Sequence, residues 1–182
     1  HGNISITNAT FTENKATAGS GGGLYVNTGN INIKNKATFT SNTATSSGGG
    51  IYATKGDITI TNAELTTNQA NNGGGIHTEG DGTLGNIEIT NATFDQNHAI
   101  AGSGGGVYVN NADLEIKTLA SFTGNTSTVS GGAMYATSGH ITIKDAQMES
   151  NTATTSGGGI YATGGNVIIT TATLSSNEAA NG

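Results

Sequence analysis

The sequence contains no proline, no cysteine, no tryptophan and no arginine. Without proline, no position is barred from donating its backbone N–H to a neighbouring strand. Without cysteine, the chain has neither a disulfide framework nor a thiolate metal site. The net charge is −6, and such a surface repels phosphate, which argues against nucleic acid as a partner.

Hydrophobic residues are also scarce, at 33% of 182 residues, whereas there are 30 glycines. That share is too low for a thick globular core and fits an elongated fold with one apolar column per strand. Disorder is the alternative for a chain rich in Gly, Thr and Asn, but the apolar residues fall at strict positions. No window is apolar enough to cross a membrane, and the N-terminus is not a signal peptide. The sequence starts and stops inside its repeat, so we expect it to be part of a longer protein.

One motif recurs seven times: Ala, any residue, a large apolar residue, two polar residues and Asn. Its large apolar residue and its amide are Phe11 and Asn14, Phe39 and Asn42, Leu65 and Asn68, Phe94 and Asn97, Phe122 and Asn125, Met148 and Asn151, and Leu174 and Asn177. The repeats are about 26–28 residues long, with one of 29. A near-constant period in this range predicts a repeat architecture.

Two further segments complete each repeat. The first alternates apolar and polar residues, as in Ile87 to Thr90, and predicts a strand with one buried face. The other reads Gly-Gly-Gly/Ala, an aliphatic residue and then an aromatic ring. If the aliphatic residue points inward, the ring points outward. These rings are Tyr25, Tyr52, His77, Tyr108, Tyr135 and Tyr161, and they include every tyrosine of the chain.

Three short strands per repeat, without helical periodicity and with turns too short for a crossover helix, predict an all-β fold. We expect a right-handed parallel β-helix of about seven coils, with three short strands per coil, spanning residues 1–182 as one unit. The Phe/Leu/Met and Asn columns should lie inside, where each amide can bond the turn backbone and its copies in neighbouring coils.

One turn, residues 79–86, is twice as long as the others. Insertions in a solenoid map to loops, often on a binding face, although a neutral insertion explains the length equally well. The candidate contact residues are therefore the outward aromatic column together with Glu79, Asp81 and Leu84 of this turn. The alternative for the column is that its rings only stabilise one another.

The sequence gives little support for an enzymatic function. A polysaccharide lyase of this shape needs a strong base and a cation, and arginine is absent; a glycosidase needs converging carboxylates. Asp95 should face threonines in the coils on either side. Glu88 and Glu115 share a column, but Lys117 lies nearby, as expected of a solvated charged face. We therefore expect no enzyme, no catalytic residue and no cofactor.

Ion and ice binding are also disfavoured. The calcium-binding Gly-Gly-x-Gly-x-Asp repeat lacks its Asp in every copy, so Asp81 with Glu79 is the one pair that could hold a weak ion. The four histidines fall in different segments and imply no metal site. Lysine and glutamate interrupt the outward threonines that an ice-binding array requires.

The two motifs together, Gly-Gly-Gly/Ala-aliphatic and Phe-x-x-Asn, resemble the passenger repeats of the chlamydial polymorphic outer membrane proteins. The resemblance covers the whole chain, with six copies of one motif and seven of the other. The sequence departs from the family in having Gly where Ala is common, kept only at Ala133, and in replacing Phe by Leu or Met in three copies.

The resemblance implies a passenger fragment of an autotransporter, displayed at the bacterial outer membrane. Family passengers act as adhesins toward host epithelial cells, a growth-factor receptor is the target of some members, and they self-associate. We therefore expect a host-cell surface receptor as partner and a homo-oligomer as an additional state. The alternative is a structural stalk that carries a binding head elsewhere in the parent chain.

Overall fold

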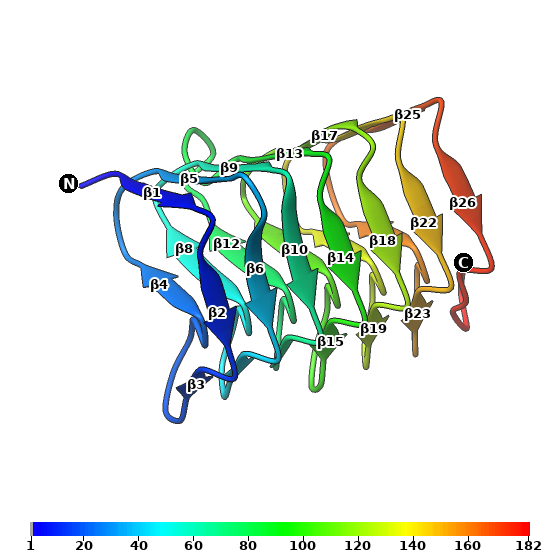
Figure 1. Ribbon diagram of the computed structural model, residues 1–182. Coiled ribbons are helices and arrows are strands. Elements are labelled where there is room, and N and C mark those ends of the chain that lie inside the picture. The colour runs from blue at the N-terminus through cyan, green and yellow to red at the C-terminus, as the bar shows by residue number, and fades with distance from the viewer. Residues whose placement is uncertain (1) are drawn as a thin grey trace.

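The structure, a computed structural model, describes residues 2–182 as a stack of coils whose ends carry the two chain termini (Figure 1). It consists of six complete coils of four strands each and two strands of a seventh coil. Every strand pairs in parallel with its equivalent in the adjacent coil, for example β10 with β6 and β14. These observations confirm the predicted parallel β-helix. Residues 2–182 include no helix that could span a membrane.

Four parallel sheets run along the stack. The first contains β1 (Ile4–Thr7), β5 (Ile31–Lys34), β9 (Ile58–Thr61), β13 (Ile87–Thr90), β17 (Leu114–Thr118), β21 (Ile141–Lys144) and β25 (Val167–Thr170). The second contains β2 (Thr10–Thr12), β6 (Ala37–Thr40), β10 (Ala63–Thr66), β14 (Thr93–Asp95), β18 (Ser121–Thr123), β22 (Gln147–Glu149) and β26 (Thr173–Ser175).

The other two sheets have six strands each. The third contains β3 (Lys15–Ala16), β7 (Thr43–Ala44), β11 (Gln69–Ala70), β15 (His98–Ala99), β19 (Thr126–Ser127) and β23 (Thr152–Ala153). The fourth contains β4 (Leu24–Val26), β8 (Ile51–Thr54), β12 (Ile76–Glu79), β16 (Val107–Asn110), β20 (Met134–Ala136) and β24 (Ile160–Ala162). The third sheet adds a strand to the three expected per coil, and its two-residue strands are too short to produce an alternation in the sequence.

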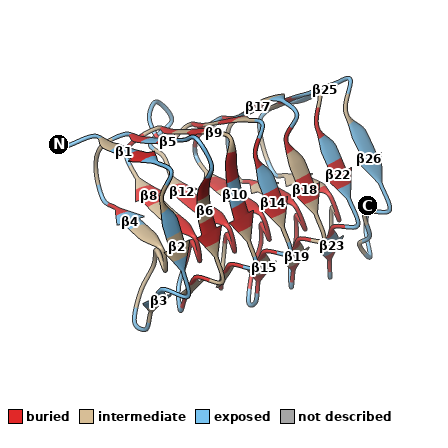
Figure 2. Cartoon of the chain, in the orientation of Figure 1, coloured by how far each residue is buried: buried red, intermediate tan, exposed pale blue. Residues whose placement is uncertain are grey.

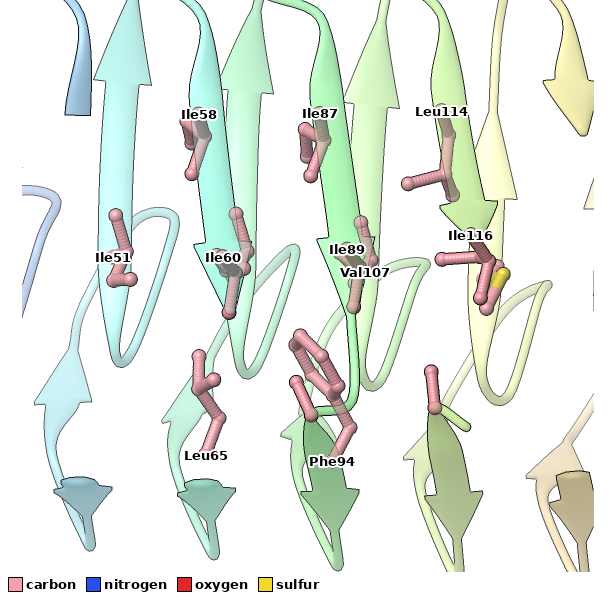
Figure 3. Close-up of a cluster of buried hydrophobic side chains, with 14 of the residues drawn as sticks. Ile51, Ile58, Ile60, Leu65, Ile87, Ile89, Phe94, Val107, Leu114 and Ile116 are labelled. Carbon is pink, nitrogen blue, oxygen red and sulfur yellow. The ribbon is translucent and has the colours of Figure 1, made fainter. Parts of the chain in front are cut away.

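Buried residues recur from coil to coil along the axis (Figure 2), and their side chains form columns in the interior (Figure 3). Alternate residues of the first sheet, such as Ile87 and Ile89, are buried and lie in register with their equivalents in the next coil. Phe94 and Phe122 stack with ring centroids 4.6 Å apart and planes within 8°. Because strands of adjacent coils are in register, equivalent side chains meet, and the one or two inward residues of each strand suffice to fill the interior.

A ladder of asparagine amides runs through the same interior. In Asn97, Oδ1 accepts from both the backbone N–H and Nδ2 of Asn68, at 3.0 Å each. Its Nδ2 donates to Oδ1 of Asn125 at 3.0 Å and to the carbonyl oxygen of Leu65 at 2.8 Å. Both donors and both acceptor positions of the amide are thus occupied, which explains why a polar side chain is fully buried here.

The corner between the second and third sheets explains the position of the ladder. The residue before each amide is in the left-handed region, with φ of 53° at Gln96 and 60° at Gly124. This single residue turns the chain and directs the following N–H inward, where the amide oxygen of the next coil accepts it. The spacing between the large apolar residue and Asn is therefore fixed by the corner.

The three positions of each glycine triplet before the fourth sheet differ in how strictly they require glycine. Gly104 has a φ of +69°, in the left-handed region. Gly105 lies against backbone, since a Cβ there would be 2.4 Å from the carbonyl oxygen of Gly132. The third position is more tolerant, because Ala133 occupies it in its own coil and is fully buried. This tolerance explains why the sequence has Ala at the third position in one copy and Gly in the others.

The terminal coils depart from the predicted burial. Asn14 is exposed, Leu174 is 42% exposed, and Phe11 and Asn177 are only partly buried. These residues occupy the same columns as their buried equivalents, but each has a neighbouring coil on one side only. The prediction that the whole column is inside is therefore correct for coils two to six and wrong for the exposed residues at the ends.

We predict that Asn97→Ala destabilises the protein by about 3–5 kcal/mol, because it leaves the donors of Asn68 and the carbonyl of Leu65 buried without partners. The matched control is Asn14→Ala, at an exposed end of the same ladder, for which we expect less than about 1.5 kcal/mol. Urea unfolding followed by far-ultraviolet circular dichroism measures both. Equal effects of the two substitutions would contradict the structural role of the ladder.

We also predict that Gly105→Ala is more harmful than Gly106→Ala. The methyl group at 105 would meet backbone oxygens of Gly132 and Thr126 at 2.4 and 2.5 Å, which only a backbone shift can relieve. At 106 the nearest atom is the carbonyl oxygen of Ala133 at 2.8 Å, in a column that already accepts alanine. We expect a loss of about 3 kcal/mol against about 1 kcal/mol, measured by the same unfolding experiment, and the reverse order would refute this account.

Candidate binding surface

The predicted aromatic column lies on the outer face of the fourth sheet. Its residues are paired in register from coil to coil, as shown by Tyr25 with Tyr52 and by Tyr108 with Tyr135. Successive ring centroids are 4.3–5.6 Å apart, and every pair except the tilted Tyr52–His77 pair is stacked. The six rings form one continuous stack along the axis.

Stacking determines what the column offers to a partner. The faces of inner rings such as Tyr108 are covered by their neighbours, so their edges and hydroxyl groups form the accessible part. Tyr25 has a neighbouring ring on one side only and is 55% exposed, whereas the other tyrosines are half-buried. The prediction of an outward column is thus confirmed for the five tyrosines, with a smaller exposed area than free rings would have.

His77 was predicted to be exposed, and this prediction is wrong: the residue is 3% exposed. Its imidazole is shorter than the phenol rings of Tyr52 and Tyr108, which lie on either side at 5.4 and 4.3 Å. Glu79 covers its outer edge, with Oε1 2.6 Å from Nε2 of His77. A partner therefore reaches the tyrosines and Glu79 at this point of the column, not the histidine ring.

A polar column runs beside the aromatic one, two residues further along each strand. Glu79 accepts from Nδ2 of Asn110, and Oδ1 of Asn110 accepts from the hydroxyl of Thr137. The hydrogen bond to His77 is the main cause that holds the pKa of the Glu79 carboxyl below its usual value, against the opposing effect of burial. We did not predict Asn110 and Thr137 as part of this surface, although the period of two along a strand could have indicated them.

The negative charge of Glu79 also acts on the neighbouring phenols. Burial is the main cause that raises the pKa of Tyr52 and Tyr108, and the charge of Glu79 adds to the rise in both. These hydroxyl groups are therefore neutral and remain hydrogen-bond donors at physiological pH. The centre of the column combines phenol donors with one carboxylate.

The long turn at 79–86 begins at this carboxylate and folds over the turns of earlier coils; it projects at one edge of the stack in Figure 1. The N–H groups of Gly85 and Asn86 donate to Oδ1 of Asp57 at 3.1 and 3.0 Å. Leu84 is 41% exposed and lines a hollow of about 330 Å³ together with Lys55. The turn is thus held in place and presents an apolar side chain beside the turns of earlier coils.

The two carboxylates of this turn that were expected to hold a weak ion, those of Glu79 and Asp81, do not converge on one point. Asp81 accepts from the Thr83 hydroxyl at 2.7 Å, which is the main cause that lowers the pKa of its carboxyl, and the N–H groups of Leu84 and Thr83, at 2.9 and 3.0 Å, lower it further. Glu79 instead turns toward His77 and Asn110. Within residues 2–182, no three His, Asp or Glu side chains are arranged to hold a metal ion.

The carboxylates on the first sheet form a charged face. Glu88 and Glu115 are adjacent in register, and Nζ of Lys117 lies 2.8 Å from the first and 3.7 Å from the second. Asp95 faces Thr66 and Thr123 across the strand pairs. Each of these arrangements agrees with the sequence-based interpretation.

Three segments, residues 8–27, 36–54 and 145–163, match the Chlamydia polymorphic membrane protein (Chlamydia_PMP) repeat. Each spans one strand of the second sheet, one asparagine of the amide ladder, the glycine triplet and one tyrosine of the fourth sheet. The chain matches no curated protein and no solved structure in the other two comparisons. The family name implies a protein of the outer membrane or the cell surface, and the chain is a β-helix that contains three Chlamydia polymorphic membrane protein repeats.

Proposed function

We propose that this β-helix is an adhesin segment displayed on the bacterial surface and that its fourth sheet contacts a protein receptor on host epithelial cells. The observation that carries the proposal is the continuous column of five tyrosines around Glu79. Tyrosine supplies rigid contact area together with a hydroxyl group, and it is enriched at the energetic centres of protein interfaces. No comparable row of aromatic side chains occurs on the outer faces of the other sheets within residues 2–182.

The long turn extends this surface. Leu84 offers an apolar contact at one edge, and Glu79 connects the turn to the tyrosine column. Because the turn is fixed by Asp57 and by its own Asp81, it loses little conformational entropy when it binds. A receptor with an exposed arginine or lysine would find Glu79 as its charged counterpart, and a growth-factor receptor ectodomain is the type of partner we propose.

A structural stalk is the second candidate. It is favoured by the saturation of the amide ladder and by the stacking of the tyrosine rings, whose faces are occupied by one another. In that case the column stabilises a rod, and a different part of the parent protein makes the contact.

Self-association is a further part of the proposal. This part rests on the resemblance of the repeats to a family whose passengers self-associate. Size-exclusion chromatography with light scattering tests it: we expect oligomers whose share rises with concentration, and a monomer at every concentration would contradict it.

We predict that Tyr108→Ser with Tyr135→Ser reduces attachment of beads coated with this protein to epithelial cells, at least tenfold in apparent affinity, about 1.4 kcal/mol. The matched control replaces the same two residues by phenylalanine, which keeps the ring stack and removes only the hydroxyl groups. Circular dichroism of both variants should equal that of the unchanged protein.

The control separates two forms of the proposal. Intermediate binding by the phenylalanine variant would show that the hydroxyl groups contribute, and full binding would show that ring area suffices. Undiminished attachment by the folded serine variant would refute the proposed surface and favour the stalk.

A further inference from the structure

A second surface lies at a different edge of the coils, where the first sheet turns into the second. A groove of about 470 Å³ is lined there by Asn8, Asn35, Lys36, Asn62, Ala63, Glu64, Asn91 and Thr93. These residues come from four successive coils, between β1 and β2 at one end and β13 and β14 at the other. The groove therefore runs along the axis, and at a rise of about 4.8 Å per coil its corners span about 14 Å.

The corner asparagines have a local cause. Asn8, Asn35, Asn62 and Asn91 have φ between 49° and 56°, in the left-handed region that asparagine tolerates best among residues with a side chain. The corner of the second coil is unusual, since Asn35 is followed by Lys36, also at a φ of 61°. This corner is one residue longer than its equivalents in the coils on either side. It forms one wall of the groove, and the local turn does not require a lysine there.

The polar groups of this groove are largely unused. Among residues 2–182, the side chains of Asn8, Asn35, Lys36 and Glu64 have neither a hydrogen-bond nor an ion-pair partner. The exception among the four amides is a bond from Nδ2 of Asn91 to Oδ1 of Asn62. The interior ladder differs, because each inner amide of coils two to six has all its hydrogen-bonding positions filled.

The lining defines the chemistry of a ligand. It contains no aromatic ring and one small apolar side chain, so an apolar or stacking ligand gains little. Its one ammonium group and one carboxylate cancel, so the lining gives neither a cation nor an anion a net attraction, and the net charge of −6 further disfavours an anionic ligand. What remains is a neutral molecule rich in hydroxyl and amide groups.

We propose that this groove binds a neutral oligosaccharide that carries N-acetylamino groups. The amide of Asn35 can pair with an acetamido group through one donated and one accepted hydrogen bond. The carboxylate of Glu64 can accept from two adjacent hydroxyl groups, and the ammonium of Lys36 donates to ring or hydroxyl oxygens. The repeat of amides along the axis suits a linear oligomer lying in the groove. The proposal does not depend on the tyrosine surface.

The test is a titration of the ¹⁵N-labelled protein with chitotriose, followed by amide NMR spectra. We expect shifts confined to the groove residues and a Kd of about 0.1–1 mM, typical of a binding free energy near −5 kcal/mol. Glu64→Gln and Asn35→Ala should each raise the Kd at least fivefold. The matched control is Glu149→Gln, an exposed carboxylate of the same sheet that lies outside the groove.

Three comparison ligands make the result decisive. Cellotriose has the same linkage without acetamido groups, acetylated triglycine amide has amides without hydroxyl groups, and a heparin trisaccharide is anionic. Chitotriose should bind at least fivefold more tightly than each of them. Absence of groove shifts with chitotriose, equal or tighter binding of any comparison ligand, or an equal effect of Glu149→Gln would overturn the proposal.

Discussion

A buried amide can keep all its hydrogen bonds only if an identical amide lies one coil away, and this requirement governs the whole structure. The Asn97 side chain depends on Asn68 and Asn125 for its partners, and an unpaired donor at this depth costs about 1–3 kcal/mol. The segment from the large apolar residue to Asn therefore has constant length in all seven copies. Differences in repeat length occur elsewhere, for example in the long turn at 79–86 and in the corners at Asn35 and Lys36 and at Thr118 and Leu119.

The same register makes every outward position a column. A side chain on the surface meets its equivalents above and below, so aromatic residues stack and like charges require a compensating lysine, as Glu88 and Glu115 do with Lys117. A single change in a column is accommodated by its neighbours: where His77 interrupts the tyrosines, Glu79 and Asn110 complete the surface. Such departures from the repeat are where this fold acquires individual surface chemistry.

Hydrogen-bonding saturation separates the structural polar groups from those available to ligands. The inner amides and the acceptors at the turns, such as Asp57 and Asp113, are occupied by backbone N–H groups of adjacent coils. The tyrosine hydroxyl groups and the polar side chains of the corner groove face water instead. Binding by this protein is therefore proposed at these two surfaces, one aromatic and suited to a protein, the other free of rings and suited to a sugar.

The sequence alone determined the repeat, the parallel stacking and the inward columns, because period-two alternation and the fixed Phe-x-x-Asn spacing leave few other ways to bury these residues. It also placed the five tyrosines on one outer face. Only the tertiary structure decided how much of each ring stays accessible, since the exposure of Tyr25 and the burial of His77 depend on neighbours one coil away. The strands of the third sheet have only two residues, which is too short to leave a periodic signal in the sequence. The hydrogen bond between Glu79 and Asn110 joins residues about 30 positions apart, so only the stacking of the coils reveals it.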